Sequence, residues 1–222
     1  SRMAGRDDGG LRLSDLARAG FQELSDARSR LVDLAGGLGL SPAEILPLFA
    51  AAADPDAALT TARHLAEAHP GVLAGFTADQ GRRLALLFGA SPALGDFFAR
   101  HPGRLAGILA GEGRVVGAEE ARAELLASVA APDAERGSGA VLAGEPGWNA
   151  LRVRYRELLA ELTLFDLLQS RAGAAAEAFE TVAASLSGLA AAAIEASLRV
   201  AHATLAAGLS GPPTAEERLG AT

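Results

Sequence analysis

Alanine and leucine dominate this sequence, with 52 Ala and 35 Leu among 222 residues against 9 Val and 3 Ile. Alanine and leucine have high helix propensities, whereas β-branched residues favour strands. The composition therefore predicts an all-α fold, which we expect to be an irregular bundle of short helices followed by a long antiparallel helical hairpin. A chain of this length can bury about 70% of the surface it exposes when unfolded, so it needs no disulfide or metal to fold.

Two missing residue types exclude whole classes of chemistry. The sequence has no cysteine, which excludes disulfides, thiolate nucleophiles, Cys-type zinc sites and iron–sulfur clusters. All 20 basic residues are arginine, so no lysine is available for a Schiff base or a phosphate-binding P-loop. Acidic residues lie among the arginines and the formal net charge is -7, which argues against a nucleic-acid partner. We expect a cytoplasmic protein.

Capping residues indicate where helices begin. Ser41-Pro42-Ala43-Glu44 combines a hydroxyl cap, a proline at the first helical position and a glutamate that can bond back to the cap amide. This pattern predicts a helix from about Pro42 to Ala53. Ser14 and Ser25 are interpreted as caps of two earlier helices, the second of which ends at Gly36-Gly37. Further helices are predicted to begin after Asp54, Thr77, Ser91 and His101, and near Ala118.

Changes in composition divide the chain into five parts. The segment before the long helices is rich in glycine, proline and charge, which is typical of a mobile linker. The predicted parts are a disordered leader (1–10), a cluster of short helices (11–131), a flexible linker (132–147), a long helical hairpin (148–209) and a tail (210–222).

Apolar residues at helical spacing define the predicted hairpin. The stripe of its first helix consists of Leu151, Tyr155, Leu158, Leu162 and Phe165. The stripe of its second helix consists of Phe179, Val182, Leu186, Leu189, Ala193, Ala196 and Val200. The alanines should allow the two helices to approach closely.

Charged residues interrupt the alanine-rich stretches near the C-terminus, as Glu177, Glu180, Glu195 and Arg199 do. No uninterrupted apolar run approaches the roughly 20 residues that a bilayer span requires, so we predict no membrane partner.

Candidate catalytic and metal-binding patterns have structural explanations. Asp54-Pro55-Asp56 has the aspartate spacing with which nucleotidyltransferases hold two divalent ions, but those aspartates must lie on a strand. Because Pro55 stands at a predicted helix start, we interpret Asp54 as a cap. The four histidines lack metal-type spacing, and His69 and His101 precede prolines at helix ends, where a ring nitrogen can meet an open carbonyl. We therefore predict no catalytic, cofactor-binding or metal-ligating residue.

Three arginines cluster on the first long helix. Arg152, Arg154 and Arg156 could hold a phosphate or a carboxylate of a partner. The alternative is a solvated helix face with an ion pair between Arg154 and Glu157, three residues apart. Both interpretations stay open.

Four stretches along the chain carry a family resemblance. They are residues 16–21 (LARAGF), 87–102 (LFGASPALGDFFARHP), 151–167 (LRVRYRELLAELTLFDL) and 182–201 (VAASLSGLAAAAIEASLRVA). In this order they resemble the N-terminal helical segment that precedes the first nucleotidyltransferase domain of bifunctional glutamine synthetase adenylyltransferase/adenylyl-removing enzymes. The stretch 151–167 resembles the L-R-x-x-Y-R-x-x-L-L...D-L pattern of that segment.

The resemblance implies a role in nitrogen metabolism. Full-length members carry one domain that attaches AMP from ATP to a tyrosine of glutamine synthetase and another that removes it by phosphorolysis. ATP and Mg are therefore expected for the full-length family, but no cofactor is expected in this chain. The chain lacks the family's Gly-Gly...Asp-x-Asp site and should be inactive alone, with its tail leading toward an absent catalytic domain. The implied partners are the downstream nucleotidyltransferase domain, glutamine synthetase and a PII-type signalling protein.

The resulting hypothesis is a non-catalytic segment whose hairpin supports the adjoining AMP-removing domain. Two alternatives are a stand-alone helical protein-interaction adaptor and a small-molecule-binding helical regulator, although abundant alanine favours close packing over a cavity. Apolar surface left bare by missing domains could also make the chain dimerise. The candidate interdomain interface consists of Arg152, Tyr155, Arg156, Glu157 and Asp166.

Overall fold

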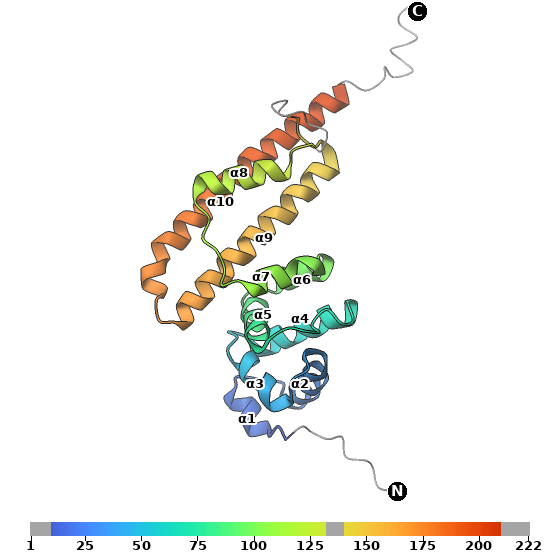
Figure 1. Cartoon of the computed structure of the whole chain (residues 1–222), viewed down its shortest axis with the longest axis vertical. Coiled ribbons are helices and arrows are strands. Elements are labelled where there is room, and N and C mark those ends of the chain that lie inside the picture. Colours follow the sequence, from blue (N-terminus) through green and yellow to red (C-terminus); the bar gives the residue numbers. More distant parts are fainter. Residues whose placement is uncertain (1–9, 132–139, 210–222) are drawn as a thin grey trace, which may run out of the picture. The chain divides into compact units, whose positions relative to one another are not determined.

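The computed structural model describes residues 10–131 and 140–209. All named secondary-structure elements in these ranges are helices (Figure 1). The predicted all-α fold is therefore confirmed. One isolated antiparallel bridge, between Ala130 and Val141, stands outside the helices. The chain forms two compact units, the first made by residues 1–114 and 159–178 and the second by residues 115–158 and 179–222.

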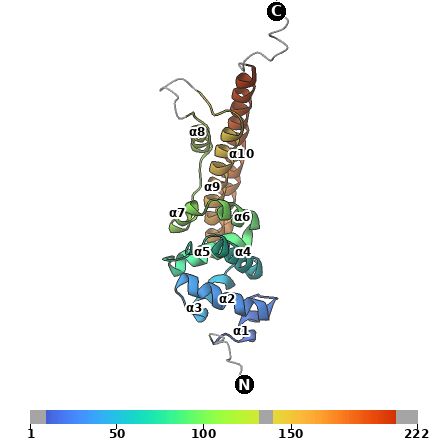
Figure 2. The same cartoon turned by 90° about the vertical axis from the view of Figure 1, so that its right-hand side faces the viewer.

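The first unit is a cluster of short helices, in which α4 packs against α2, α5 and α6. Figures 1 and 2 show successive layers formed by α2 with α3, α4 with α5, and α6 with α7. Phe49, Phe88 and Phe98 are fully buried in this unit. Its helices are α1 (Leu13–Arg18), α2 (Leu24–Leu38), α3 (Pro42–Ala50), α4 (Pro55–Ala68), α5 (Ala78–Ala90), α6 (Pro92–Arg100), the 3₁₀ helix η1 (Pro102–Arg104), α7 (Leu105–Ala110) and the second half of α9 (Gly144–Arg171).

Side-chain caps begin three of these helices, as the sequence predicts. The Ser41 hydroxyl accepts a hydrogen bond from the Glu44 amide at 3.3 Å, and the Glu44 carboxylate accepts one from the Ser41 amide at 2.8 Å. Thr77 caps α5 in the same reciprocal way. The Asp54 carboxylate accepts from the Ala57 amide at 2.9 Å, which confirms Asp54 as the cap of α4.

The predicted boundaries of the first two helices are wrong. Ser14 and Ser25 lie inside α1 and α2, which begin one residue earlier and have no side-chain cap. The second helix also continues through Gly36-Gly37, because the next residue, Leu38, packs into the core. It ends at Gly39, whose left-handed φ of 67° is a conformation that glycine adopts at little cost.

The second unit combines α8 (Ala118–Ser128) with the first half of α9 and most of α10 (Ala175–Leu209). The Gly144 amide, at the start of α9, donates to the Thr204 hydroxyl near the end of α10 at 2.8 Å. The two long helices run in opposite directions (Figure 1), as the hairpin predicts. Gly188 of α10 lies so close to α8 that a Cβ atom there would be 2.9 Å from the Ala118 Cα atom.

Two observations bear on the predicted division of the chain. Helix α9 begins at Gly144, so residues 144–147 of the predicted linker are helical. Residues 115–131 group with the long helices and not with the short ones. The predicted leader up to residue 9, the linker residues 132–139 and the tail lie outside the described residues, and the predicted domain boundaries stay a prediction.

The buried face of α10 differs from the predicted stripe. Leu189, Ala196 and Val200 are buried as expected, but Phe179 and Leu186 are 69% and 44% exposed. The inner face is instead completed by small residues, Ser185, Gly188 and Ala192, because small side chains permit the close approach of neighbouring backbone.

Helix α10 is more apolar than the sequence prediction allowed. By length and composition it is able to cross a membrane, and the bent pair of α2 and α3 meets the same test. This is weak evidence for a membrane span, since core helices of soluble proteins meet the same test. The Glu195 carboxylate of α10 is held in ion pairs with Arg122 and Arg199.

Candidate functional site

An ion-pair cluster joins α8 to α9 inside the second unit. The Arg154 guanidinium donates to the Glu157 carboxylate at 3.1 Å, and it also forms a short ion pair with Glu124 of α8. Burial by itself would lower the pKa of Arg154, but the hydrogen bonds with Glu124 and Glu157 raise that pKa above its ordinary value. Arg154 therefore stays charged, and the cluster holds α8 on α9.

A second cluster joins α8 to α10. Two guanidinium nitrogens of Arg122 donate to the two carboxylate oxygens of Glu195, at 2.7 and 2.8 Å. Arg199, one turn along α10, donates to the same carboxylate at 3.0 Å. The hydrogen bond from Arg122, followed by that from Arg199, lowers the pKa of Glu195. This geometry fixes a carboxylate in place and leaves it ionised at neutral pH.

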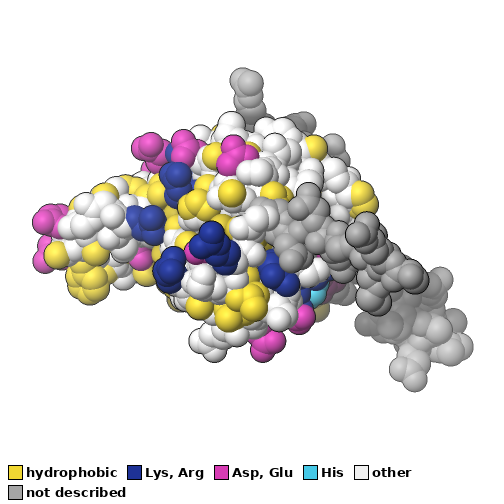
Figure 3. Space-filling view, turned by 90° about the horizontal axis from the view of Figure 1, so that it is seen from below, with side chains coloured by type: hydrophobic (Ala, Val, Ile, Leu, Met, Phe, Trp, Pro, Cys, Tyr) yellow, Lys and Arg dark blue, Asp and Glu magenta, His cyan; other side chains and the backbone are white. Residues whose placement is uncertain are grey.

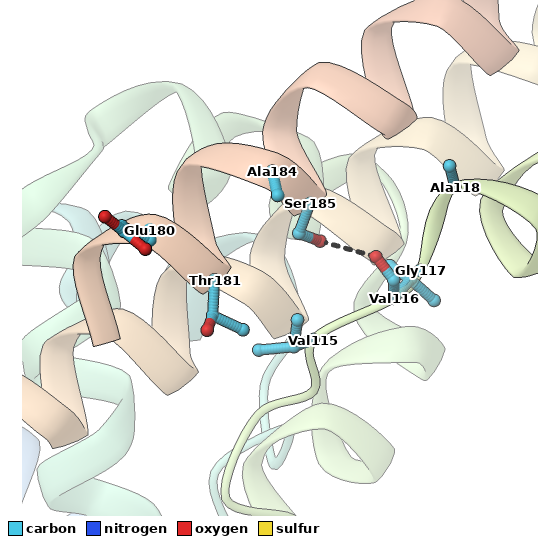
Figure 4. A pocket seen from close by; sticks show the side chains of 8 residues that line it. All are labelled: Val115, Val116, Gly117, Ala118, Glu180, Thr181, Ala184 and Ser185. Atoms are coloured by element: carbon cyan, nitrogen blue, oxygen red, sulfur yellow. Dashed lines mark hydrogen bonds between the residues drawn. The ribbon is translucent and has the colours of Figure 1, made fainter. Parts of the chain in front are cut away.

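An open groove of about 440 Å³ lies between the start of α8 and the first turns of α10 in the second unit (Figure 4). The Ser185 hydroxyl donates to the Val116 carbonyl at 2.8 Å, so this buried hydroxyl is satisfied within the chain. The walls of the groove are mostly apolar. They consist of Val115, Val116, Gly117, Ala118, Glu180, Thr181, Ala184 and Ser185.

In the first unit, the segment after α7 docks on the second half of α9. The Arg114 amide donates to the Glu161 carbonyl at 3.0 Å, and the Arg114 side chain donates to the Glu161 carboxylate at 2.8 Å. Gly113 has a φ of +79°, and a Cβ atom there would overlap the backbone of Phe165. Glycine is required at this position both by its conformation and by the close approach.

The five predicted interface residues all lie on α9, and their role as an interface stays a prediction. Arg152, Tyr155, Arg156 and Glu157 belong to the second unit and Asp166 to the first. Arg152 is exposed and donates to the Asn149 side chain at 2.9 Å. Glu157 is only 7% exposed and binds Arg154. The predicted pair between Arg154 and Glu157 is confirmed, but Glu157 is buried, so this pair does not lie on a solvated face.

The residues predicted to be structural are placed as expected. His69 and His101 stand at the C-terminal ends of α4 and α6. The His69 Nε2 atom lies 2.5 Å from the Ala99 carbonyl oxygen. The Asp56 carboxylate accepts a hydrogen bond from the Gln22 amide at 2.8 Å, which ties α4 to the loop before α2.

Two further observations concern metal-binding groups and the distribution of charge on the surface. Within residues 10–131 and 140–209, no group of three or more His, Asp or Glu side chains is placed to hold a metal ion. On the face shown in Figure 3, arginine side chains lie among acidic and hydrophobic ones.

Sequence reasoning does not predict the contacts that join separate helices. Arg122 and Glu195 are 73 residues apart, and Arg114 and Glu161 are 47 apart. Such pairings depend on how helices pack, which charge patterns within one helix do not reveal. Ser185 is one of three serines on α10, with Ser187 and Ser197, so the sequence does not single it out.

Comparison with known proteins supports the resemblance. The chain is 43% identical over 213 residues to the bifunctional glutamine synthetase adenylyltransferase/adenylyl-removing enzyme of Leifsonia xyli. This alignment covers 94% of the chain and 20% of the relative's length. No family model matches the chain. No solved structure matches it either. The chain is thus similar, along nearly its whole length, to about one fifth of a bifunctional glutamine synthetase adenylyltransferase/adenylyl-removing enzyme.

Proposed function

We propose that this chain is a non-catalytic N-terminal helical segment of an enzyme that adenylylates and deadenylylates glutamine synthetase. In this proposal it supports the adjoining AMP-removing domain in the cytoplasm. The single observation that carries the proposal is the 43% identity to such an enzyme over 94% of the chain. Glutamine synthetase and a PII-type signalling protein would be partners of the whole enzyme, which would use ATP and Mg²⁺ in domains outside this chain.

The use of the resemblance motifs supports a scaffold role. In the stretch 87–102, Phe88, Leu94 and Phe98 are buried core residues. Gly89 of the same stretch lies where a Cβ atom would be 2.7 Å from the Ala52 Cβ atom, so it permits close packing of α5 on the end of α3. These residues serve packing, as expected of a segment that positions other domains.

The charged groups of α9 are the proposed contact with the AMP-removing domain. Arg152 is exposed, and its contacts with Asn149 and with Glu145, the latter at 3.7 Å, stay on its own helix. Exposed pairs of this kind contribute little to stability, so a partner's carboxylate can replace them at low cost. Tyr155, Arg156 and Asp166, which follow Arg152 along α9, are half-buried. Glu157 would act indirectly, by holding Arg154.

An activity comparison tests the proposal. Phosphate-dependent release of AMP from adenylylated glutamine synthetase should be absent with the 222-residue chain. It should be present with a polypeptide extended through the next few hundred residues that the gene encodes. Release by neither would overturn the proposal and favour the adaptor, as would a reading frame that stops after Thr222.

A charge reversal tests the interface. Arg152→Glu with Arg156→Glu in the extended polypeptide should reduce AMP release or lower its melting temperature. The matched control is Arg18→Glu on α1, an exposed arginine paired with Asp15 at 3.2 Å. Equal activity and melting in all three proteins would contradict the proposed role of α9.

A further inference from the structure

Exposed large hydrophobic side chains are concentrated on one helix. Among the described residues, seven such side chains are exposed, and six of them belong to α10. Ile194, Leu198 and Leu205 are 64%, 56% and 66% exposed. Scattered single apolar residues are normal on protein surfaces, but a contiguous set indicates an interaction surface.

These residues form a stripe along one side of α10. We define the outer stripe as Leu186, Ile194, Leu198 and Leu205, whose separations of eight, four and seven residues keep them within one side of a helix. The buried residues Leu189 and Ala196 point to the opposite side, toward the rest of the second unit. Helix α10 is thus apolar on two opposite faces, and only one of them is covered.

A helix that is apolar all round is normally covered on all sides, in the core of a larger protein or in a membrane. No charged residue occurs from Thr181 to Ile194. The Glu195 carboxylate, at the edge of the outer stripe, is bound by Arg122 and Arg199. The outer stripe therefore offers a partner apolar contact and no ionic one.

The charges of α10 favour protein over lipid as the covering partner. The helix carries Glu177, Glu180 and Glu195 against two basic residues, Arg199 and His202. Helices that lie on membranes are rich in basic residues, which bind anionic lipid headgroups. The relative is far longer than this chain, which matches only 20% of it, so four fifths of such an enzyme lies outside the matched part.

We propose that the outer stripe of α10 is the surface on which an apolar face of the enzyme's remaining polypeptide packs. The proposal rests on the proposed function, since it takes the chain to act as part of the longer enzyme. It goes beyond that function by assigning an apolar contact to α10, distinct from the charged contact assigned to α9.

Cysteine labelling tests the proposal, because the chain has no cysteine of its own. Leu198→Cys is compared with Ala123→Cys, an exposed position on α8 of the same unit. A water-soluble maleimide should label both at similar rates in the 222-residue chain. In the extended polypeptide, the reaction of Leu198→Cys should be slowed by at least about 10-fold, while Ala123→Cys should keep its rate. Mass spectrometry of the labelled peptide separates the new thiol from any others.

Three results would overturn the proposal. The first is equal labelling of Leu198→Cys in the short and the extended polypeptide. The second is protection in the 222-residue chain that grows with its concentration, which would identify a second copy as the partner. The third is protection of that chain by phosphatidylcholine–phosphatidylglycerol vesicles, which would identify a membrane surface.

The outcome is separable from that of the proposed function. An extended polypeptide that releases AMP but leaves Leu198→Cys unprotected would refute only the α10 surface. One that protects the thiol but releases no AMP would refute only the function. Ile194→Gln provides a second check, since it should leave melting of the 222-residue chain unchanged and lower that of the extended polypeptide.

Discussion

Arg122 and Glu195 join α8 to α10 through two parallel hydrogen bonds, at 2.7 and 2.8 Å. A paired arrangement of this kind combines charge with fixed geometry, because the planar guanidinium matches the carboxylate. It is the contact that most directly relates a residue of the short α8 to one in the middle of the longest helix. Its strength should depend on pH.

The stability contribution of Glu195 should disappear in acid. Arg122 and then Arg199 lower the pKa of Glu195 in the folded chain, whereas in the unfolded chain it lies at about 4.3. The contribution is therefore fully present above the unfolded pKa and is lost as pH falls through the lower, folded pKa. Glu195→Gln should lower the melting temperature at pH 7, and the difference from the unchanged protein should shrink as pH falls below the unfolded pKa. Circular dichroism melting checks this, with exposed Glu180→Gln as the control; a difference that persists in acid would contradict it.

Gly113 and Gly173 should respond differently to alanine although both have a φ of +79°. Around Gly173 no atom lies within 4 Å of a built Cβ atom, whereas at Gly113 the Cβ atom would overlap the backbone of Phe165. Gly173→Ala should cost about 1 kcal/mol for the left-handed conformation alone. Gly113→Ala should cost about 3 kcal/mol or more, since backbone cannot move aside cheaply. Urea unfolding of both variants measures the difference, and equal costs would refute the assigned contact.

Gly36 and Gly188 form a second matched pair, both inside helices. Gly36 has open space around it, so Gly36→Ala should stabilise the chain by about 1 kcal/mol through helix propensity. At Gly188 the new Cβ atom would lie 2.9 Å from the Ala118 Cα atom. Gly188→Ala should lose that gain, and Gly188→Val should destabilise by about 1–3 kcal/mol through overpacking. Stabilisation by Gly188→Val would show that α8 is not seated there.

Leu189 and Leu198 test the two faces of α10. Leu189 is fully buried, so Leu189→Ala should cost about 2–5 kcal/mol. Leu198 is 56% exposed, and Leu198→Ala should change the stability of the 222-residue chain by less than about 1 kcal/mol. Denaturant melts of the two variants suffice. The reverse ranking would contradict the buried face assigned to α10.

Local chemistry explains what could be predicted from the sequence. The caps at Ser41, Asp54 and Thr77 are confirmed. They are predictable because each depends on residues within three positions of the helix start. The face of α10 was misjudged at Phe179 and Leu186 because nearly every position there is apolar, so periodicity does not distinguish one side from another. Only the packing of Gly188 against Ala118 decides which side is covered.

The candidate site was less predictable than the fold. The pair of Arg154 with Glu157 is predicted by the spacing of the two residues on one helix. The pairs of Arg154 with Glu124 and of Arg122 with Glu195 require α8 to return onto the long helices. A segment of low helix propensity joins α8 to the long helices, and no rule of sequence spacing specifies where that segment places α8.

The two units share the chain in an interleaved order, because residues 159–178 complete a unit that begins with residues 1–114. During synthesis the short helices leave the ribosome first, but the half of α9 on which Gly113 and Arg114 dock is made only after α8. The first unit therefore cannot close until half of the second unit has been translated. Folding of the nascent chain should thus wait for the second half of α9, and chains that stop between residues 114 and 159 should be substrates for chaperones and proteases.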